Sequence, residues 1–192
     1  MIKHFLTFEK NIAELEGKIE DLKHISSNSD LNIAEEIGKL QNKVADELTD
    51  TYSNLNPWQK VQVARHPDRP QFQDVIEYLI DDYMSLGGDR LFGNDNALTG
   101  GVGYFRGKKV LLLGIDKGKN TNDRILRNFG MARPEGYRKA IRLMELANKF
   151  NLPVLSFIDT AGAYPGKGAE ERGQAKANAS CVDACLKLNS PM

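Results

Sequence analysis

The chain has little histidine and little cysteine, which limits the chemistry available to it. Only three histidines and two cysteines occur among its 192 residues. His4, His24 and His66 lie far apart in the sequence, and Cys181 and Cys185 lack the usual spacing of a structural zinc site. We therefore expect no metal site and no disulfide framework. The two cysteines, four residues apart on a predicted helix, are interpreted as core packing.

Excess charge and long apolar runs are also absent. The 26 basic side chains balance the 26 acidic ones, which argues against nucleic acid as the main partner. The longest apolar run, residues 110–115, is too short to span a bilayer, and the first residues show no signal peptide. These features favour a cytoplasmic protein without a membrane span.

A helical pattern comes first, over residues 5–25, with apolar side chains three and four positions apart. The polar stretch 26–30 interrupts it, and a second helical pattern then continues through Leu48. Together the two patterns predict an antiparallel helical hairpin. We expect residues 1–52 to form this hairpin domain and residues 53–192 to form a second domain with mixed α/β structure.

Prolines and glycines divide the beginning of the second domain. Pro57, Pro67 and Pro70 bracket a short predicted helix, because each proline restricts the residue before it. The next helix is predicted to be capped by Asp74 and to continue to a stop at Gly87–Gly88. This part of the chain is therefore expected to be helical up to the first strand.

The strands that follow are predicted to bring two loops to one edge of a sheet. Residues 98–105 and 109–115 predict a hairpin joined at Arg106–Gly107–Lys108. A polar, basic loop and a helix over about 135–150 then lead to a strand at 154–158. Strand, crossover helix and strand predict a parallel pair, and ligands of such sheets bind beyond the carboxyl ends of the strands.

The turn-rich segment 159–166, which precedes a final helix expected from about 169 to 188, is the first candidate site. A phosphate cradle is excluded, because Ala161 and Gly168 stand where a Walker loop needs a glycine and a hydroxyl residue. Residues 100–107 likewise fail the dinucleotide-binding pattern, because its third glycine is absent. No histidine accompanies the nearby hydroxyl and acid groups, so a nucleophilic triad is not favoured. A backbone oxyanion site and an ordinary tight turn remain as alternatives.

The basic loop after residue 115 is the second candidate. It carries Lys117, Lys119, Arg124 and Arg127, whose side chains could bind a carboxylate or a phosphate. The same cluster is also typical of a solvated surface. Both interpretations remain open from the residues alone.

Longer segments point to one family. They are WQKVQVARHPDRP at 58–70, GGDRLF at 87–92, KGKNTNDRILRNFGMARPEGYRKAIRLMELANKF at 117–150 and FIDTAGAYPGKGAEERGQA at 157–175. In this order they closely resemble the alpha subunits of bacterial acetyl-CoA carboxylase carboxyltransferase, over nearly the whole chain. The resemblance implies an α/β fold of the crotonase/ClpP-like class. In that fold β-β-α units wind into a spiral, here an incomplete one preceded by the helical hairpin.

The resemblance also implies a function and its partners. Together with a carboxyltransferase beta subunit, which supplies the zinc ribbon, such a chain transfers carboxylate from carboxybiotin on the biotin carboxyl carrier protein to acetyl-CoA. The product is malonyl-CoA for fatty acid biosynthesis. Biotin carboxylase is a further implied partner within an ATP-binding, nucleotide-binding complex, and the transferase core is expected to be α2β2. The resemblance implies two intermediates, a biotin enolate and an acetyl enolate. Both place negative charge on a carbonyl oxygen, which backbone amides stabilise.

Carried onto this sequence, the resemblance implies a set of site residues. The backbone amides of Gly162 and Ala163 would stabilise the oxyanion. Asp159 would fix the shape of their loop, with its carboxylate on turn amides. The substrate-binding residues would come from this loop and from the basic loop, and they are Thr160, Tyr164, Gly166, Lys117, Arg127, Asn128 and Gly130.

Two departures from the family modify these expectations. Ala161 replaces a usual proline, which leaves the loop less rigid. The chain also ends at Met192, about where family members enter another strand and a glycine-rich loop, so we expect a truncated subunit. The isolated chain is expected to be catalytically silent and prone to aggregate. The alternatives are a non-catalytic assembly or regulatory fragment of the complex, and another crotonase-type acyl-CoA enzyme.

Overall fold

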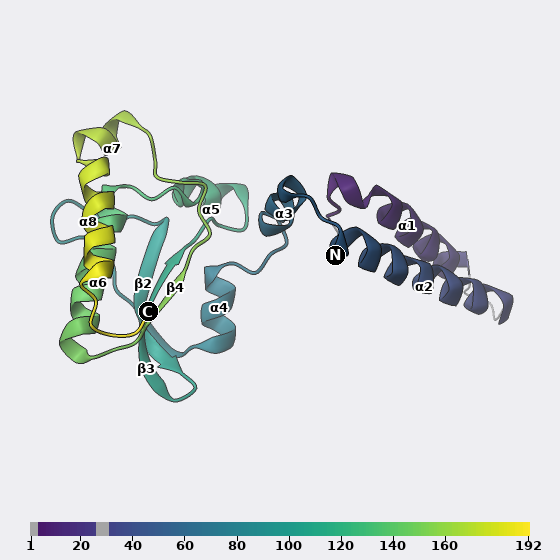
Figure 1. Ribbon diagram of the computed structural model, residues 1–192, viewed down its shortest axis with the longest axis horizontal. Helices are drawn as coiled ribbons and strands as arrows, with labels where there is room; N and C mark the ends of the chain where they lie inside the picture. Colours follow the sequence, from purple (N-terminus) through teal and green to yellow (C-terminus); the bar gives the residue numbers. More distant parts are fainter. Residues whose placement is uncertain (1–3, 26–30) are drawn as a thin grey trace. The chain divides into compact units, whose positions relative to one another are not determined.

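The computed structural model describes residues 4–25 and 31–192 (Figure 1). Its contacts divide the chain into two compact units, Met1–Arg69 and Pro70–Met192. The predicted domain boundary between residues 52 and 53 falls inside the first unit and stays a prediction. Each unit is described by itself below.

The first unit is helical. It contains the short helix η1 (Thr7–Glu9), α1 (Lys10–Ile25), α2 (Leu31–Ser53) and α3 (Pro57–Ala64). The two predicted helical patterns are therefore confirmed, and α1 packs on α2 through a small core of four buried side chains, Ile12, Leu15, Ile19 and Val44. The predicted interruption at 26–30 lies outside the described residues.

The short helix between the prolines is confirmed as α3. The side chain of Asn56 accepts a hydrogen bond from the amide of Gln59 at 2.9 Å, and the Gln59 side chain accepts one from the amide of Asn56 at 2.8 Å. Pro57 occupies the first helical position, where a missing N–H costs nothing. These local signals fix where the helix begins.

The second unit is built on a mixed sheet with the strand order β1-β2-β3-β4. Strands β1, β2 and β3 pair antiparallel, and β3 pairs with β4 in parallel, as the crossover pattern predicted. The strands are β1 (Asp81–Ser85), β2 (Leu98–Phe105), β3 (Lys108–Ile115) and β4 (Val154–Phe157). The helices are α4 (Phe72–Leu79), α5 (Thr121–Leu126), η2 (Asn128–Gly130), α6 (Pro134–Phe150), α7 (Lys167–Glu171) and α8 (Gln174–Leu186).

Helices cover both faces of this sheet, with α6 and α8 on one face and α4 on the other (Figure 1). On the first face, Leu111 and Leu113 of β3 pack into a core with Leu143 of α6. On the second face, Leu112 packs with Phe72 of α4. Because β3 is buried on both faces, its sequence is a continuous apolar run. The packing on both faces also holds its carboxyl end in place.

The β2–β3 hairpin closes as predicted, with Arg106 and Gly107 in left-handed conformations between the paired residues Phe105 and Lys108. Three glycines of β2 lack space for any side chain. A Cβ on Gly101 would collide with the Met84 carbonyl oxygen of β1. The same atom on Gly100 would lie 2.6 Å from Leu143 Cδ1, and on Gly103 2.5 Å from Ile80 Cγ2.

The helix predicted to run to Gly87–Gly88 is wrong beyond Leu79, because β1 follows at once. The backbone of Asp82 is left-handed, with φ of 50°, and the chain then pairs with the glycine-rich strand β2. Asp74 is not the cap residue either. It lies in the first turn of α4, where its carboxylate accepts the amide of Gln71 at 2.8 Å.

The predicted final helix is also wrong in detail. Gly173 adopts a left-handed conformation, with φ of 78°, and divides the segment into α7 and α8. The polar loop after β3 contains the short helix α5, which begins after Asn120, whose side chain accepts the amide of Asp123 at 2.9 Å. Strand β4 ends at Phe157, and Ile158 is largely exposed.

Candidate active site

Two loops meet at the carboxyl ends of the parallel strands. We call residues 116–133 the β3 loop and residues 158–166 the β4 loop. In Figure 1 both lie at the same end of the sheet, near α5 and α7. The parallel pairing of β3 and β4 brings them together, as expected for ligand sites in such sheets.

The β3 loop folds around the buried carboxylate of Asp116. Arg127 Nη1 lies 2.9 Å from Asp116 Oδ2, and Gln73 Nε2 donates to the same oxygen at 3.0 Å. The amide of Gly118 donates to Asp116 Oδ1 at 3.1 Å. Arg127 therefore supports the wall of the loop from inside, and its charge is neutralised by a buried acid.

The β3 loop then passes through three consecutive left-handed residues. The φ angles are 47° at Asn128, 55° at Phe129 and 75° at Gly130. Such conformations are unfavourable for residues other than glycine and persist only where neighbours hold them. The Asn128 side chain donates to the Met131 carbonyl at 2.8 Å, and a Cβ on Gly130 would lie 2.7 Å from Lys117 Cγ. Asn128 and Gly130 thus shape the backbone of the loop.

The β4 loop is fastened to the β3 loop. The Thr160 hydroxyl donates to the Gly130 carbonyl at 2.7 Å, and the amide of Tyr164 donates to the Ala132 carbonyl at 3.1 Å. Asp159, which was expected to bind turn amides, instead forms an ion pair with Lys117. The structure therefore brings residues of the two predicted clusters into one site.

The backbone amides of the β4 loop differ in their availability. The amide of Gly162 donates to Thr160 Oγ1 at 3.0 Å. The amide of Ala163 has no acceptor among the described residues. Gly162 has φ of 137°, and no atom lies within 4 Å of the position a Cβ would take. The amides of Ala161 and Gly166 likewise have no acceptor among the described residues, so Ala163 is one of several amides of the loop that are open to an acceptor. Gly162 gives the loop its backbone shape.

Tyr164 is immobilised on several sides. Its ring lies against Gly166, where any Cβ would collide with ring atoms. The guanidinium of Arg133 lies 5.3 Å from the centroid of the same ring, within the range of a cation–π interaction. Gln174 at the start of α8 donates from Nε2 to the Tyr164 carbonyl at 3.2 Å and to the Ala132 carbonyl at 2.9 Å.

Sequence reasoning missed Asp116, Arg133 and Gln174. An acid directly after a buried strand is a recognisable signal, so Asp116 was open to prediction. Nothing near Gln174 in the sequence indicates that its side chain reaches two loops. Its Oε1 atom is buried and accepts no hydrogen bond from the described residues, although both Nε2 protons are used.

The remaining predicted cations, Lys119 and Arg124, also have partners within the protein. Lys119 Nζ lies 2.5 Å from Asp74 Oδ1, and this contact lowers the pKa of Asp74 and raises the pKa of Lys119. Arg124 Nε donates to the Gly118 carbonyl at 3.3 Å. The basic loop is therefore held by contacts within itself, with the α4 region and with the β4 loop.

Two of the histidines lie together, and the two cysteines differ in burial. His4 and His66, expected to be apart, lie together, with His66 Nε2 2.8 Å from the His4 carbonyl and His4 Nδ1 2.9 Å from Asp68. The core-packing interpretation fits Cys181, where burial raises the pKa of the thiol to about 11, but not the exposed Cys185. Among residues 4–25 and 31–192, no group of three or more His, Cys, Asp or Glu side chains is placed to hold a metal ion.

An apolar cavity of about 480 Å³ lies beside the β4 loop, between β4, α6 and α8. Thr160 borders it, together with Phe157, Met144 and Cys181.

In the described part of the chain, no helix has the length and apolar character needed to cross a membrane.

Comparison with known protein families identifies the family of this chain. Residues 5–192 match the family described as acetyl co-enzyme A carboxylase carboxyltransferase-like. The chain belongs to this family. The predicted resemblance is confirmed over both units of the structure.

Curated members of the carboxyltransferase family are closely similar. The acetyl-coenzyme A carboxylase carboxyl transferase subunit alpha of Rhodospirillum centenum is 56% identical over 189 residues, which are 98% of this chain and 60% of the relative. The protein of the same name from Rhodopseudomonas palustris is 57% identical over 190 residues, 99% of this chain and 59% of the relative. The chain thus spans about 60% of the length of these relatives.

Solved structures of carboxyltransferases share the fold. The transcarboxylase 12S crystal structure matches with a TM-score of 0.53 and 19% identity, over 66% of this chain and 23% of that chain. The beta subunit of P. aeruginosa geranyl-CoA carboxylase matches with a TM-score of 0.50 and 20% identity, over 66% of this chain and 22% of that chain. The predicted crotonase-like α/β fold is therefore confirmed.

Proposed function

We propose that this carboxyltransferase-family chain acts as an alpha subunit that transfers carboxylate from carboxybiotin to acetyl-CoA and forms malonyl-CoA. The observation that carries the proposal is the family match over residues 5–192. The more than 50% identity to curated alpha subunits supports the same reaction. The proposed partners are a carboxyltransferase beta subunit, the biotin carboxyl carrier protein and biotin carboxylase, with an α2β2 core in the cytoplasm. ATP binding is not part of the proposal for this chain.

The site contributes backbone polarity rather than a side-chain nucleophile. Carboxybiotin, carried on a partner protein, supplies the carboxyl group when bound. The amide of Ala163 would donate to an oxygen on which negative charge develops, and Gly162 would set the loop conformation that exposes it. A preorganised amide needs no rearrangement during reaction, which is why such donors lower barriers.

The other site residues would position these groups. Thr160 and Tyr164 bind the β4 loop to the β3 loop. The Lys117–Asp159 pair joins the same two loops near their start, and Gly130 leaves room for the Lys117 chain. We propose that these contacts hold the walls between which the substrates react.

A reconstitution assay tests the function. The chain is mixed with a carboxybiotin donor, acetyl-CoA and the beta subunit, and malonyl-CoA and complex formation are both measured. The proposal predicts malonyl-CoA that requires this chain and is absent without the beta subunit, a result that would overturn the expectation from the sequence that the chain is catalytically silent. A complex without product would instead favour the assembly or regulatory alternative, and neither complex nor product would contradict both.

The substitution Gly162→Val tests the role of the β4 loop. A φ of 137° is strained for valine, so the amide of Ala163 should lose its orientation while the fold is retained. We expect turnover in the reconstituted complex to fall about 100-fold, the scale of losing one oxyanion donor. The matched control is Gly107→Val, another left-handed glycine with open space, at the far end of β3. Unchanged turnover in Gly162→Val would remove this loop from the mechanism.

A further inference from the structure

The site needs a cation for any anionic substrate group, and the predicted cations are already engaged. Lys117 pairs with Asp159, and Arg127 pairs with the buried Asp116. Arg124 donates to a carbonyl of its own loop. An available positive charge must therefore come from a residue that the sequence did not indicate.

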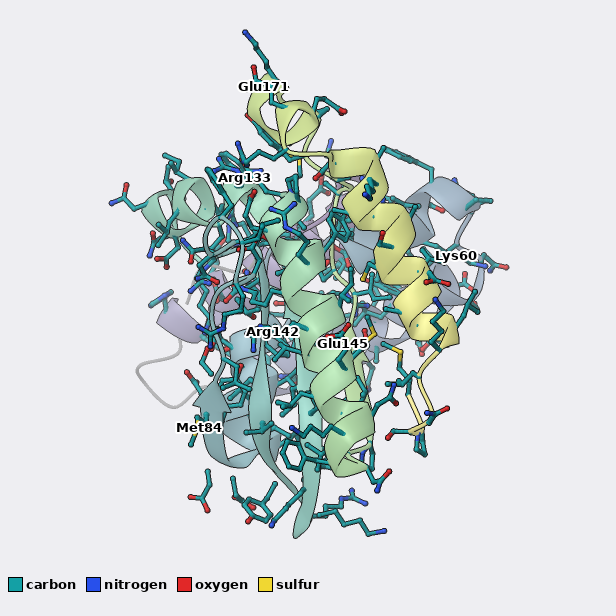
Figure 2. The ribbon with its side chains drawn as sticks, turned by 90° about the vertical axis from the view of Figure 1, so that its left-hand side faces the viewer. Lys60, Met84, Arg133, Arg142, Glu145 and Glu171 are labelled. Carbon is teal, nitrogen blue, oxygen red and sulfur yellow. The ribbon has the colours of Figure 1, made fainter. Side chains whose placement is uncertain are left out.

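Arg133 is the cation of the two loops whose guanidinium makes neither an ion pair nor a hydrogen bond to the described residues. Figure 2 shows it at the N-terminal end of α6, the end toward which α7 and the labelled Glu171 also lie. Its backbone carbonyl accepts the amide of Gly136 at 2.9 Å, within the first turn of α6. The side chain is exposed and lies over the ring of Tyr164.

The acids around Arg133 are occupied by other groups. Glu135 is buried and accepts Arg138 Nη2 at 3.1 Å and Arg172 Nε at 2.6 Å. Asp95 is also buried, and its carboxylate accepts the amide of Leu98 at 3.0 Å. The positive charge of Arg133 is consequently left for something outside the described contacts.

The ring beneath Arg133 belongs to the β4 loop itself. The backbone of Tyr164 is held by Ala132 and Gln174, so the ring is a fixed platform. A guanidinium stacked on an aromatic face keeps its planar edge of N–H donors available, and that edge matches the oxygens of a carboxylate or phosphate. The unengaged amide of Ala163 belongs to the residue directly before this platform.

We propose that Arg133, stacked on Tyr164, is the residue that binds an oxyanion of the substrate, a carboxylate or a phosphate. The inference rests on the proposed function for the identity of the substrates. It does not rest on the reaction for its test, because binding of an anion is measured without turnover.

Binding is followed through the side-chain Nε–H signal of Arg133 in chain labelled with ¹⁵N-arginine, alone and with the beta subunit. Malonate is the carboxylate probe and coenzyme A is the phosphate probe, so the two sources are separated. We expect a saturable shift with one of them. Arg133→Met should weaken that binding about tenfold or more, as loss of a charge-assisted pair does, and Arg133→Lys should weaken it less. Isothermal titration calorimetry measures the affinity of these variants, because they lack the Arg133 signal.

The matched control is Arg106→Met. Arg106 also stacks on an aromatic ring, with its guanidinium 5.4 Å from the centroid of Phe105, but it lies in the β2–β3 turn at the other end of β3. Its loss should leave the affinity for either probe unchanged. Thermal unfolding of all variants should agree closely, which separates binding from a stabilising role.

The outcomes divide clearly. A signal from Arg133 that neither probe shifts, or an affinity that Arg133→Met leaves unchanged, would overturn the proposal. Binding that depends on Arg133 in a complex that forms no malonyl-CoA would support the anion site and contradict the proposed reaction.

Discussion

The β3 loop and the β4 loop meet at one sheet edge, but their supports differ. The β3 loop surrounds Asp116, whose carboxylate is buried and fully engaged by Arg127, Gln73 and Gly118. The described contacts of the β4 loop are made mainly to the β3 loop and to Gln174. One loop is organised by its own core, and the other takes its position from its neighbour.

This difference indicates a direction of dependence. Damage to the β3 loop should displace both loops, whereas damage to the β4 loop should remain local. A site built in this way combines a rigid wall with a segment whose backbone amides are exposed. Substitutions in the two loops test this difference.

The largest effect is expected for Asp116→Ala. The change leaves the Arg127 guanidinium without its acid and removes the acceptor for Gln73 and Gly118. Removing one partner of a buried ion pair lowers the free energy of unfolding by about 3–5 kcal/mol. Chemical denaturation followed by circular dichroism measures it.

Asp183→Ala is the control, because Asp183 forms an exposed pair with Lys187 and should change stability by less than about 1 kcal/mol. Equal losses in the two variants would contradict the central role of Asp116. Hydrogen exchange in the β4 loop should also rise in Asp116→Ala.

A smaller effect is expected from comparing Gly130→Ala with Gly162→Ala. Both glycines have positive φ, but a Cβ on Gly130 meets Lys117 Cγ at 2.7 Å, whereas one on Gly162 meets nothing within 4 Å. We expect Gly130→Ala to lower the free energy of unfolding by about 2–3 kcal/mol and Gly162→Ala by about 1–2 kcal/mol. Denaturant titrations of both variants measure the difference, and the opposite order would refute the dependence of the β4 loop on its neighbour.

Gln174→Met should produce a local loss. Methionine keeps the volume but cannot donate to the carbonyls of Ala132 and Tyr164. The free energy of unfolding should fall by only about 1 kcal/mol. The loss of two hydrogen bonds is partly offset, because the buried Oε1, which has no partner among the described residues, is removed as well. Exchange of the amides in residues 160–166 should rise more than exchange in β3. A uniform rise over the whole unit would show that Gln174 stabilises the fold rather than the loop.

The smallest effect concerns pH. The Lys119 ammonium and the Gln71 amide hold the pKa of Asp74 below its ordinary value of 3.8. The unfolded chain therefore binds more protons in acid, so this contribution is present above about pH 4 and disappears as the pH falls further. The stability difference between the wild type and Asp74→Asn should be larger at about pH 6 than at about pH 3. A difference that grows in acid would contradict this sign.

Features with strong local signals could be predicted from the sequence. The β2–β3 turn follows from Arg106–Gly107, and the parallel pair follows from two apolar runs joined by a helix. Strand β1 could not be predicted, because its residues are mostly exposed and polar. Its conformation depends on the space that the glycines of β2 leave for it.

The candidate site was predictable to the same degree. Turn residues after the strands indicated both loops, and family resemblance selected the β4 loop among its alternatives. Whether a cation is free or neutralised depends on side chains distant in sequence, such as Asp159 for Lys117. For that reason the sequence alone could not show that the Arg133 guanidinium has no acid partner among the described residues.

The glycines of β2 have a consequence for saturation mutagenesis. At Gly100, Gly101 and Gly103 every larger residue collides with a neighbour, so a scan of all substitutions would find these positions intolerant. That intolerance would report how closely the strands and α6 pack. A methyl group has room at Gly162, and intolerance to alanine in an activity-based screen there would instead report the site.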